Sequence, residues 1–172
     1  MRTKLIITAN GTDRKGIVSE IASIVNKHNC NIETSKMVRL ENEFTTLILI
    51  DAEHDKKELL SLDLKKIKDL KIQIIETKNN HPIVYKNKFH LFINGADNEG
   101  IVYQFSNYLS NIDINIEEVN TKIENAPISA TPLFMMDIII GAKKKINLKE
   151  LTAELNKISE KLGVEIQLEK IN

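Results

Sequence analysis

The stretch NGTDRKGIV, residues 10–18, decides the fold that the sequence predicts. It follows a short apolar run and opens an amphipathic one, which is the pattern of a strand that turns into a helix. Gly11 and Gly16 allow backbone angles or close approaches that a side chain would block. Asp13 is expected to cap the helix, and the backbone N–H groups at the helix start remain available to a carboxylate or a phosphate.

The same stretch recurs as NGADNEGIV, residues 94–102. Gly95 follows Gly11 by 84 residues, and the NIE of residues 115–117 follows the NIE of residues 31–33 by the same number. One offset that holds across a turn, a helix and the next strand indicates an internal duplication.

Each copy reads as strand-helix-strand-strand-helix-strand. This order predicts the ferredoxin-like α+β fold (βαββαβ), an antiparallel sheet of four strands with both helices on one face. We expect two such domains in tandem, at residues 1–80 and 89–172, with a linker at 81–88. The expected strands cover residues 4–10, 31–40, 44–52, 71–78, 89–95, 113–124, 133–141 and 164–171, and the expected helices cover 16–29, 55–70, 100–111 and 148–162.

Apolar side chains at helical spacing mark the helix faces that we expect to be buried. They are Ile17, Val18, Ile21, Ala22, Ile24, Val25 and His28 in the first helix, and Leu59, Leu60, Leu64, Ile67 and Leu70 in the second. The sheet face away from the helices is also partly apolar. We therefore expect the two copies to pair with each other or the chain to form a homo-oligomer such as a dimer.

Composition excludes several classes of protein. The chain has 172 residues with 24 basic and 24 acidic side chains, so it lacks the basic excess of a protein that binds nucleic acid directly. Its single cysteine, Cys30, cannot form an internal disulfide and is expected to be a small buried residue in a reducing compartment. No apolar run approaches the roughly 20 residues of a membrane span, and the first residues lack a signal-peptide core. We expect a cytoplasmic protein that does not bind a membrane.

The sequence contains no recognisable catalytic constellation. The four histidines, His28, His54, His81 and His90, show no metal-ligand spacing with one another or with the cysteine. Motifs for a nucleophile elbow or a phosphate loop are also missing. We expect a protein that is not an enzyme and has no catalytic residues, metal site or cofactor.

Asp13 and its counterpart Asp97 have two interpretations. In the first, each aspartate caps a helix and has no other role. In the second, the turn also binds a small zwitterion, whose carboxylate meets backbone N–H groups and whose ammonium meets an Asp or Asn oxygen. Arg14 is either solvated or pairs with a carboxylate at a domain interface. Because NE at residues 98–99 replaces RK at 14–15, we do not expect the two turns to be equivalent.

Several motifs carry a resemblance to a known family. They are AxGxDRxGIV at residues 9–18, CNIxxSxM at 30–37 and EFT at 43–45, and in the second copy AP at 126–127 followed by PLF at 132–134. Over essentially its whole length, the chain resembles the glycine cleavage system transcriptional repressor family, whose members carry two ACT domains. Two departures are Lys15, where the turn often has proline, and EN at residues 41–42, where a glycine often lies.

The resemblance implies a sensor that binds amino acids at interfaces between ACT domains. It also implies control of transcription through a DNA-binding activator, without direct contact to DNA. The ligand contacts implied in the first copy are Asn10, Gly11, Asp13, Arg14, Gly16 and Ile17, with Asn31 facing them from a partner domain. Those implied in the second copy are Gly95, Asp97, Gly100, Ile101 and Asn115.

Two function classes remain open. The first is a non-enzymatic module that senses a small amino acid, with glycine as the candidate, and regulates transcription through a protein partner. The second is an accessory subunit that docks on an enzyme of amino-acid or one-carbon metabolism by edge-strand pairing and binds no ligand of its own.

Overall fold

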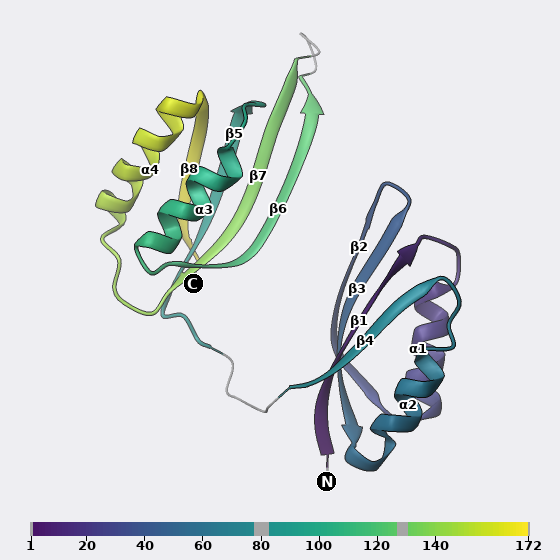
Figure 1. The fold of residues 1–172 in the computed structure, drawn as a ribbon. Coiled ribbons are helices and arrows are strands. Elements are labelled where there is room, and N and C mark those ends of the chain that lie inside the picture. Colours follow the sequence, from purple (N-terminus) through teal and green to yellow (C-terminus); the bar gives the residue numbers. More distant parts are fainter. Residues whose placement is uncertain (1, 78–82, 127–130, 172) are drawn as a thin grey trace. The chain divides into compact units, whose positions relative to one another are not determined.

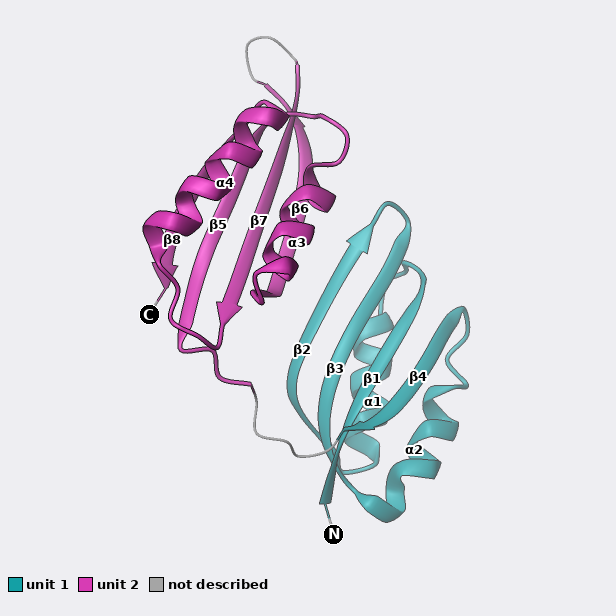
Figure 2. Cartoon of the chain, turned by 60° about the vertical axis from the view of Figure 1, so that its left-hand side comes forward, with its two compact units in different colours: residues 1–82 teal, residues 83–172 magenta. Residues whose placement is uncertain are grey.

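The computed structural model describes residues 2–77, 83–126 and 131–171. The chain divides into two compact units, Met1–Pro82 and Ile83–Asn172, which Figure 2 shows in different colours. Each unit is described by itself below. Residues 78–82, where we expect the first domain to end and the linker to begin, lie outside the described residues, as do residues 127–130, which include the proline of the AP motif at 126–127.

Unit 1 is one four-stranded antiparallel sheet with two helices on the same face (Figure 1). The strand order is β2-β3-β1-β4, so the first strand lies inside the sheet and β2 and β4 form its edges. The elements are β1 (Arg2–Thr12), α1 (Ile17–Lys27), β2 (Asn31–Leu40), β3 (Glu43–Glu53), a 3-10 turn η1 (His54–Lys56), α2 (Lys57–Leu64) and β4 (Leu70–Thr77).

Unit 2 repeats this architecture with the order β6-β7-β5-β8. Its elements are β5 (Asn87–Ala96), α3 (Ile101–Asn111), β6 (Asn115–Asn125), β7 (Pro132–Ala142), α4 (Leu148–Leu162) and β8 (Val164–Ile171). The predicted fold class, two tandem ferredoxin-like units with antiparallel sheets, is confirmed. β5 begins at Asn87, two residues earlier than the strand expected from the sequence, because the ladder with β7 extends to Ala142.

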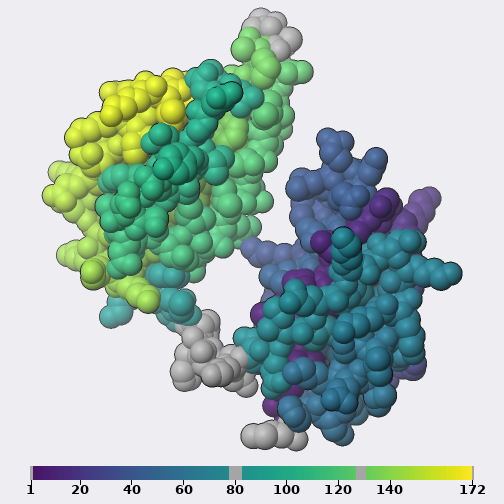
Figure 3. Space-filling model, in the orientation of Figure 1, coloured from purple at the N-terminus to yellow at the C-terminus, as the bar shows by residue number. Residues whose placement is uncertain are grey.

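The core of each unit lies between its sheet and its helices. Figure 3 shows the atoms on one outer face of the units, which cover these cores. Alternate residues of β1, namely Leu5, Ile7 and Ala9, are buried because successive side chains of a strand point to opposite faces. The buried residues of α1 are Ile17, Ile21 and Val25, at the spacing of one helix face. The corresponding core of unit 2 includes Phe89, Leu91, Ile93, Ile101, Phe105 and Leu109.

Two of the expected helix faces need correction. The helix expected at residues 55–70 ends at Leu64, where i to i+3 hydrogen bonds from Lys66 and Ile67 tighten the chain into a turn. Leu59 was expected inside but is 60% exposed, because Leu60 and Leu64 take the inward positions of this short helix. Val18 is 46% exposed for the same reason, since Ile17 and Ile21 fill the core side of α1.

The sheet face away from the helices is open in each unit. All ten residues of β2 are exposed. Val38 and Leu40 lie on the open face, where they pair with Thr45 and Glu43, and Leu47 of the neighbouring strand is 49% exposed on the same face. Apolar side chains thus do occur on the uncovered side of unit 1, as the sequence predicted. Among the described residues, no helix has both the length and the apolar character that crossing a membrane requires.

Candidate functional site

The first glycine of each turn is required by the chain itself. Gly11 lies in β1 between Phe44 and Leu70, and a Cβ built on it would lie 2.0 Å from the carbonyl oxygen of Asp69. In unit 2, a Cβ on Gly95 would lie 2.7 Å from Cα of Val164. These glycines therefore allow the segment that enters the edge strand to cross close over the end of the central strand.

The second glycine of each turn starts the helix. Gly16 and Gly100 have φ angles of 90° and 85°, in the left-handed region, and each occupies the N-cap position without a side-chain cap hydrogen bond. The cap expected from Asp13 is therefore wrong, and so is the cap expected from Asp97, because the cap position falls three residues later. Within the described residues, no side chain at the cap position accepts a hydrogen bond from the first-turn N–H groups of α1 or α3.

Asp13 instead connects the turn to the β2–β3 hairpin. Its N–H donates a 2.7 Å hydrogen bond to the carbonyl of Asn42, and its carboxylate lies 3.9 Å from Nη1 of Arg39. Arg14 pairs with Glu20 at 2.6 Å on the exposed side of α1. The turn of unit 1 thus has its polar side chains paired locally, in contacts that remain open to solvent.

The turn of unit 2 is held differently. Asp97 is exposed, and the residue after it, Asn98, makes the contacts. Its N–H donates to the carbonyl of Ala96, and its side-chain amide donates to the carbonyl of Leu162 at the end of α4, each at 2.9 Å. The sequence predicted that the two turns would differ, and the structural role of Asn98 was not anticipated.

The structure does not bring Asn31 or Asn115 to the turn of its own unit. Asn31 pairs with Asp51, whereas Gly11 pairs with Phe44 seven residues away along β3, which corresponds to roughly 23 Å. Asn31 could therefore meet a turn only from another domain, as the resemblance implies. Asn115 lines a separate pocket of about 380 Å³ at the end of α3, formed with Tyr85, Ser106, Ser110, Asp113, Ile114, Ile116 and Lys143.

A pocket of about 430 Å³ lies at the end of β1 in unit 1. It is lined by Asn10, Gly11, Thr12, Glu43, Asp69, Leu70 and Lys71. A smaller hollow of about 220 Å³ adjoins it and shares Asn10 and Lys71. The pocket includes two predicted site residues and three charged ones, Glu43, Asp69 and Lys71, that the sequence analysis missed. Aligning the strands of the two copies could have revealed them, because each differs from its counterpart in unit 2.

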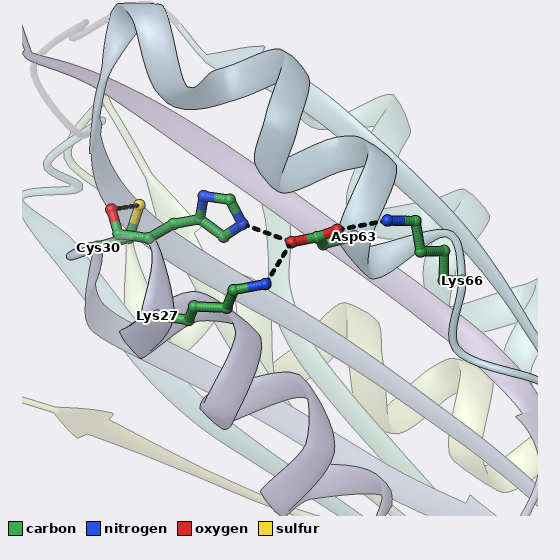
Figure 4. Close-up of polar contacts among 5 residues, drawn as sticks. Lys27, Cys30, Asp63 and Lys66 are labelled. Atoms are coloured by element: carbon green, nitrogen blue, oxygen red, sulfur yellow. Dashed lines mark hydrogen bonds and ion pairs between the residues drawn. The ribbon is translucent and has the colours of Figure 1, made fainter.

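A second polar cluster joins the two helices of unit 1 (Figure 4). Asp63 of α2 accepts hydrogen bonds from Lys66 at 2.7 Å and Lys27 at 3.1 Å, and its Oδ2 lies 3.0 Å from Nε2 of His28. These three partners, Lys66 first, hold the pKa of the Asp63 carboxyl well below its usual value. The cluster lies at the helix ends and links α1 to α2.

Cys30 comes two residues after His28 in the sequence, and it is buried, as the sequence predicted. Burial raises the pKa of its thiol, which is the opposite of what an activated nucleophile requires. The described part of the chain holds no group of three or more His, Cys, Asp or Glu side chains placed to bind a metal ion.

Residues 3–75 match the family model described as an ACT domain. The glycine cleavage system transcriptional repressor of Escherichia coli (strain K12) is 48% identical over 46 residues, which cover 27% of this chain and 24% of that protein. The match thus spans about a quarter of the length of this curated relative.

Two crystal structures match the whole chain. An unknown protein from Galdieria sulphuraria has a TM-score of 0.86 at 24% identity and covers 100% of both chains. A structure provisionally described as a glycine cleavage system transcriptional repressor has a TM-score of 0.67 at 24% identity and covers 100% of this chain and 99% of that one. At these identities, the two structures establish a shared fold.

The family match and the fold define the class: residues 3–75 match an ACT domain, and unit 2 repeats the ferredoxin-like fold of unit 1. The resemblance of the chain to the glycine cleavage system transcriptional repressor family is confirmed by the match to the Escherichia coli member. What that relative regulates is a property of the relative, and its transfer to this chain is a proposal.

Proposed function

We propose that the chain is a non-enzymatic regulator in the cytoplasm that senses a small amino acid and controls transcription through a protein partner. The observation that carries this proposal is the start of α1, which lies within the segment that matches an ACT domain and has no side-chain cap hydrogen bond. Backbone N–H groups at such a helix start suit a carboxylate. Glycine is the proposed ligand, because the curated relative is named for glycine cleavage.

The ligand is proposed to lie at the turn end of unit 1. The candidate contacts are Asn10, Gly11, Asp13, Gly16 and Ile17, with Asn31 supplied by a second copy of the chain or by a partner domain. The corresponding residues of unit 2 form a weaker or altered site, because Asn98 ties that turn to α4. Since Ile17 is 2% exposed, it contributes through its backbone and by packing.

A protein partner is proposed to carry the signal to DNA. The chain has equal numbers of basic and acidic residues, which gives little electrostatic attraction to a duplex. β2 offers a partner an exposed edge strand with apolar side chains. The same edge supports homo-oligomerisation and also the alternative function, docking on a metabolic enzyme as an accessory subunit.

The proposal is tested by a thermal-shift screen of the purified chain with each of the twenty amino acids, followed by calorimetry on any that shift it. Binding of a small amino acid, together with ligand-dependent capture of a transcriptional activator, is the expected result. A gel shift with the chain alone should show no sequence-dependent retardation. If no amino acid binds and the chain copurifies with a metabolic enzyme, the accessory-subunit function replaces this one.

A further inference from the structure

The pocket at the end of β1 lies partly on the open face of the sheet in unit 1. Asn10 and Lys71 are neighbours across β1 and β4, and Asn10 also pairs with Thr45 of β3. The side chains of these three residues are exposed. The pocket therefore opens to solvent and can receive a ligand in the unit as it stands.

The two copies differ at this pocket in a consistent way. The register places Asn94 of unit 2 where Asn10 lies, between Glu165 and Met135 instead of Lys71 and Thr45. The same comparison replaces Thr12 with Ala96, Glu43 with Leu133 and Asp69 with Gly163. The asparagine and the following glycine are kept, whereas every charged lining residue is changed.

Asp69 and its counterpart Gly163 share a backbone conformation and differ in the side chain. Asp69 has a φ of 64°, in the left-handed region, and Gly163 has nearly the same angle, 65°, at the corresponding place in unit 2. Glycine adopts this conformation more easily than aspartate does. Unit 1 thus keeps a carboxylate where the backbone favours glycine, and that carboxylate makes no hydrogen bond or ion pair within the described residues.

Lys71 and Glu43 are also without ionic partners in the part of the chain that the structure describes. Some lysines of unit 1, such as Lys4 and Lys57, pair with carboxylates at 2.7 Å and 2.6 Å, so the ammonium of Lys71 is one of several in this unit that are not paired within the described residues. The pocket therefore presents one ammonium and two carboxylates that are available to a ligand. This arrangement is complementary to a zwitterion.

We propose that this pocket holds the amino acid, with the ligand carboxylate on the ammonium of Lys71 and the ligand ammonium between Asp69 and Glu43. The inference rests on the proposed function for the class of ligand only. It places that ligand on the sheet side of the turn, next to Asn10 and Gly11, and replaces the N–H groups at the start of α1 with Lys71 as the partner of the ligand carboxylate. Because the pocket carries two negative charges and one positive charge, it disfavours aspartate and glutamate as ligands. At the corresponding described positions, unit 2 has Glu165, Leu133 and Gly163 and therefore lacks this set of charges.

The test uses the full chain and calorimetric titration with glycine and any other amino acid that gives a thermal shift. Lys71→Gln should weaken binding about tenfold or more, because it removes the charge that meets the carboxylate. The matched control is Glu165→Gln at the same position of unit 2, which should leave affinity unchanged. Backbone amide shifts on titration should concentrate at residues 10–12 and 69–71.

A second variant separates binding from folding. Asp69→Gly gives unit 1 the residue that unit 2 has, so it should raise the thermal midpoint while weakening binding. A purely structural role for Asp69 predicts the same gain in stability with no change in affinity. That result would overturn the assignment of the ammonium to Asp69.

The remaining outcomes distinguish the inference from the proposed function. If an amino acid binds as tightly to Lys71→Gln as to the parent, and Asp13→Ser abolishes binding, the ligand lies at the helix start and the pocket assignment is wrong. If none of the twenty amino acids binds the parent chain, the proposed function fails and this inference fails with it.

Discussion

Units 1 and 2 share one fold but differ where the turn meets the sheet. Both keep glycine at the crossing point, where a Cβ would meet the edge-strand segment, and both keep glycine at the left-handed helix start. The positions around these glycines are polar and charged in unit 1 and more apolar in unit 2. The backbone alone explains the shared glycines, so their presence in both units is a weak marker of a ligand site.

The helix layers differ as well. In unit 1, Asp63 joins α1 and α2 through Lys27 and His28. Within the described residues of unit 2, no ion pair joins α3 to α4, and the two helices meet through apolar side chains and Tyr108, whose pKa is raised by burial and by Glu154. Stability in unit 1 should therefore depend more on carboxylate charge than it does in unit 2.

The largest effect is expected from alanine at the crossing glycines. Gly11→Ala places a Cβ 2.0 Å from a backbone oxygen, which cannot move without breaking the β1–β4 ladder, so we expect a loss of about 3 kcal/mol or more in unit 1. Gly95→Ala should cost somewhat less in unit 2, because its nearest contact is 2.7 Å. Urea unfolding followed by amide signals of each unit measures both.

Alanine at the helix-start glycine is the control for this prediction. Gly16→Ala meets no atom within 4 Å and carries only the cost of a positive φ, about 1–2 kcal/mol. Equal losses at Gly11 and Gly16 would show that the close crossing is not what the first glycine provides.

The next effect is a selective loss of stability in acid. Hydrogen-bonded lysines lower the pKa of three carboxyls in unit 1, and these pairs are Asp63 with Lys66, Glu76 with Lys57 and Glu53 with Lys56. A carboxyl whose pKa is lower in the folded state contributes stability above its unfolded pKa of about 4, and this contribution is lost as the pH falls toward the folded value. The thermal midpoint of unit 1 should therefore fall faster than that of unit 2 below about pH 5.

Asp63→Asn is the variant that isolates the central carboxyl of this cluster. It should lower the midpoint of unit 1 at neutral pH and flatten its dependence on acid. Midpoints that fall in parallel for the two units in the parent chain would contradict the role assigned to these pairs.

The sequence predicted the architecture because its signals were local and repeated. Strand alternation and the helix face of Ile17, Ile21 and Val25 follow from side-chain spacing alone, and the fold class is confirmed. The sequence misassigned Leu59 because α2 is only two turns long, so that which leucine faces inward depends on where the helix starts and ends. The sequence also led to a wrong cap for α1. The helix begins after Gly16 and not after Asp13, because Gly16 adopts a left-handed φ that the sequence pattern does not reveal.

The candidate site was only partly predictable for a related reason. Asn10 and Gly11 belong to the motif, whereas Glu43, Asp69 and Lys71 come from two other strand ends that join it only through the ladder register. The residues that flank these three in the sequence do not form a motif that marks a binding site. Their signal lies in the contrast between the copies, and reading that contrast requires the register of both sheets.

A smaller effect is expected on self-association. The register places Leu47, which is 49% exposed on the open face of unit 1, where unit 2 has Asp137. Leu47→Asp gives unit 1 the residue that unit 2 has at this position. If the open face is buried between two copies, the change removes about 1–1.5 kcal/mol of apolar burial from the dimer. Sedimentation velocity should then show dimer dissociation shifted roughly tenfold in concentration. A parent chain that is monomeric at every concentration would contradict the predicted homo-oligomer.

The smallest effect is expected from Asp13→Ser. Because Asp13 makes no cap hydrogen bond and its carboxylate lies 3.9 Å from an exposed guanidinium, its side chain contributes little to folding. We expect the free energy of unfolding to change by less than about 0.5 kcal/mol. Asp97→Ser in unit 2 is the matched variant and should behave alike, since its turn is held by Asn98. A loss near 1 kcal/mol for Asp13 alone would instead mean that its pairing with Arg39 closes in solution, so that the carboxylate fixes the hairpin against the turn.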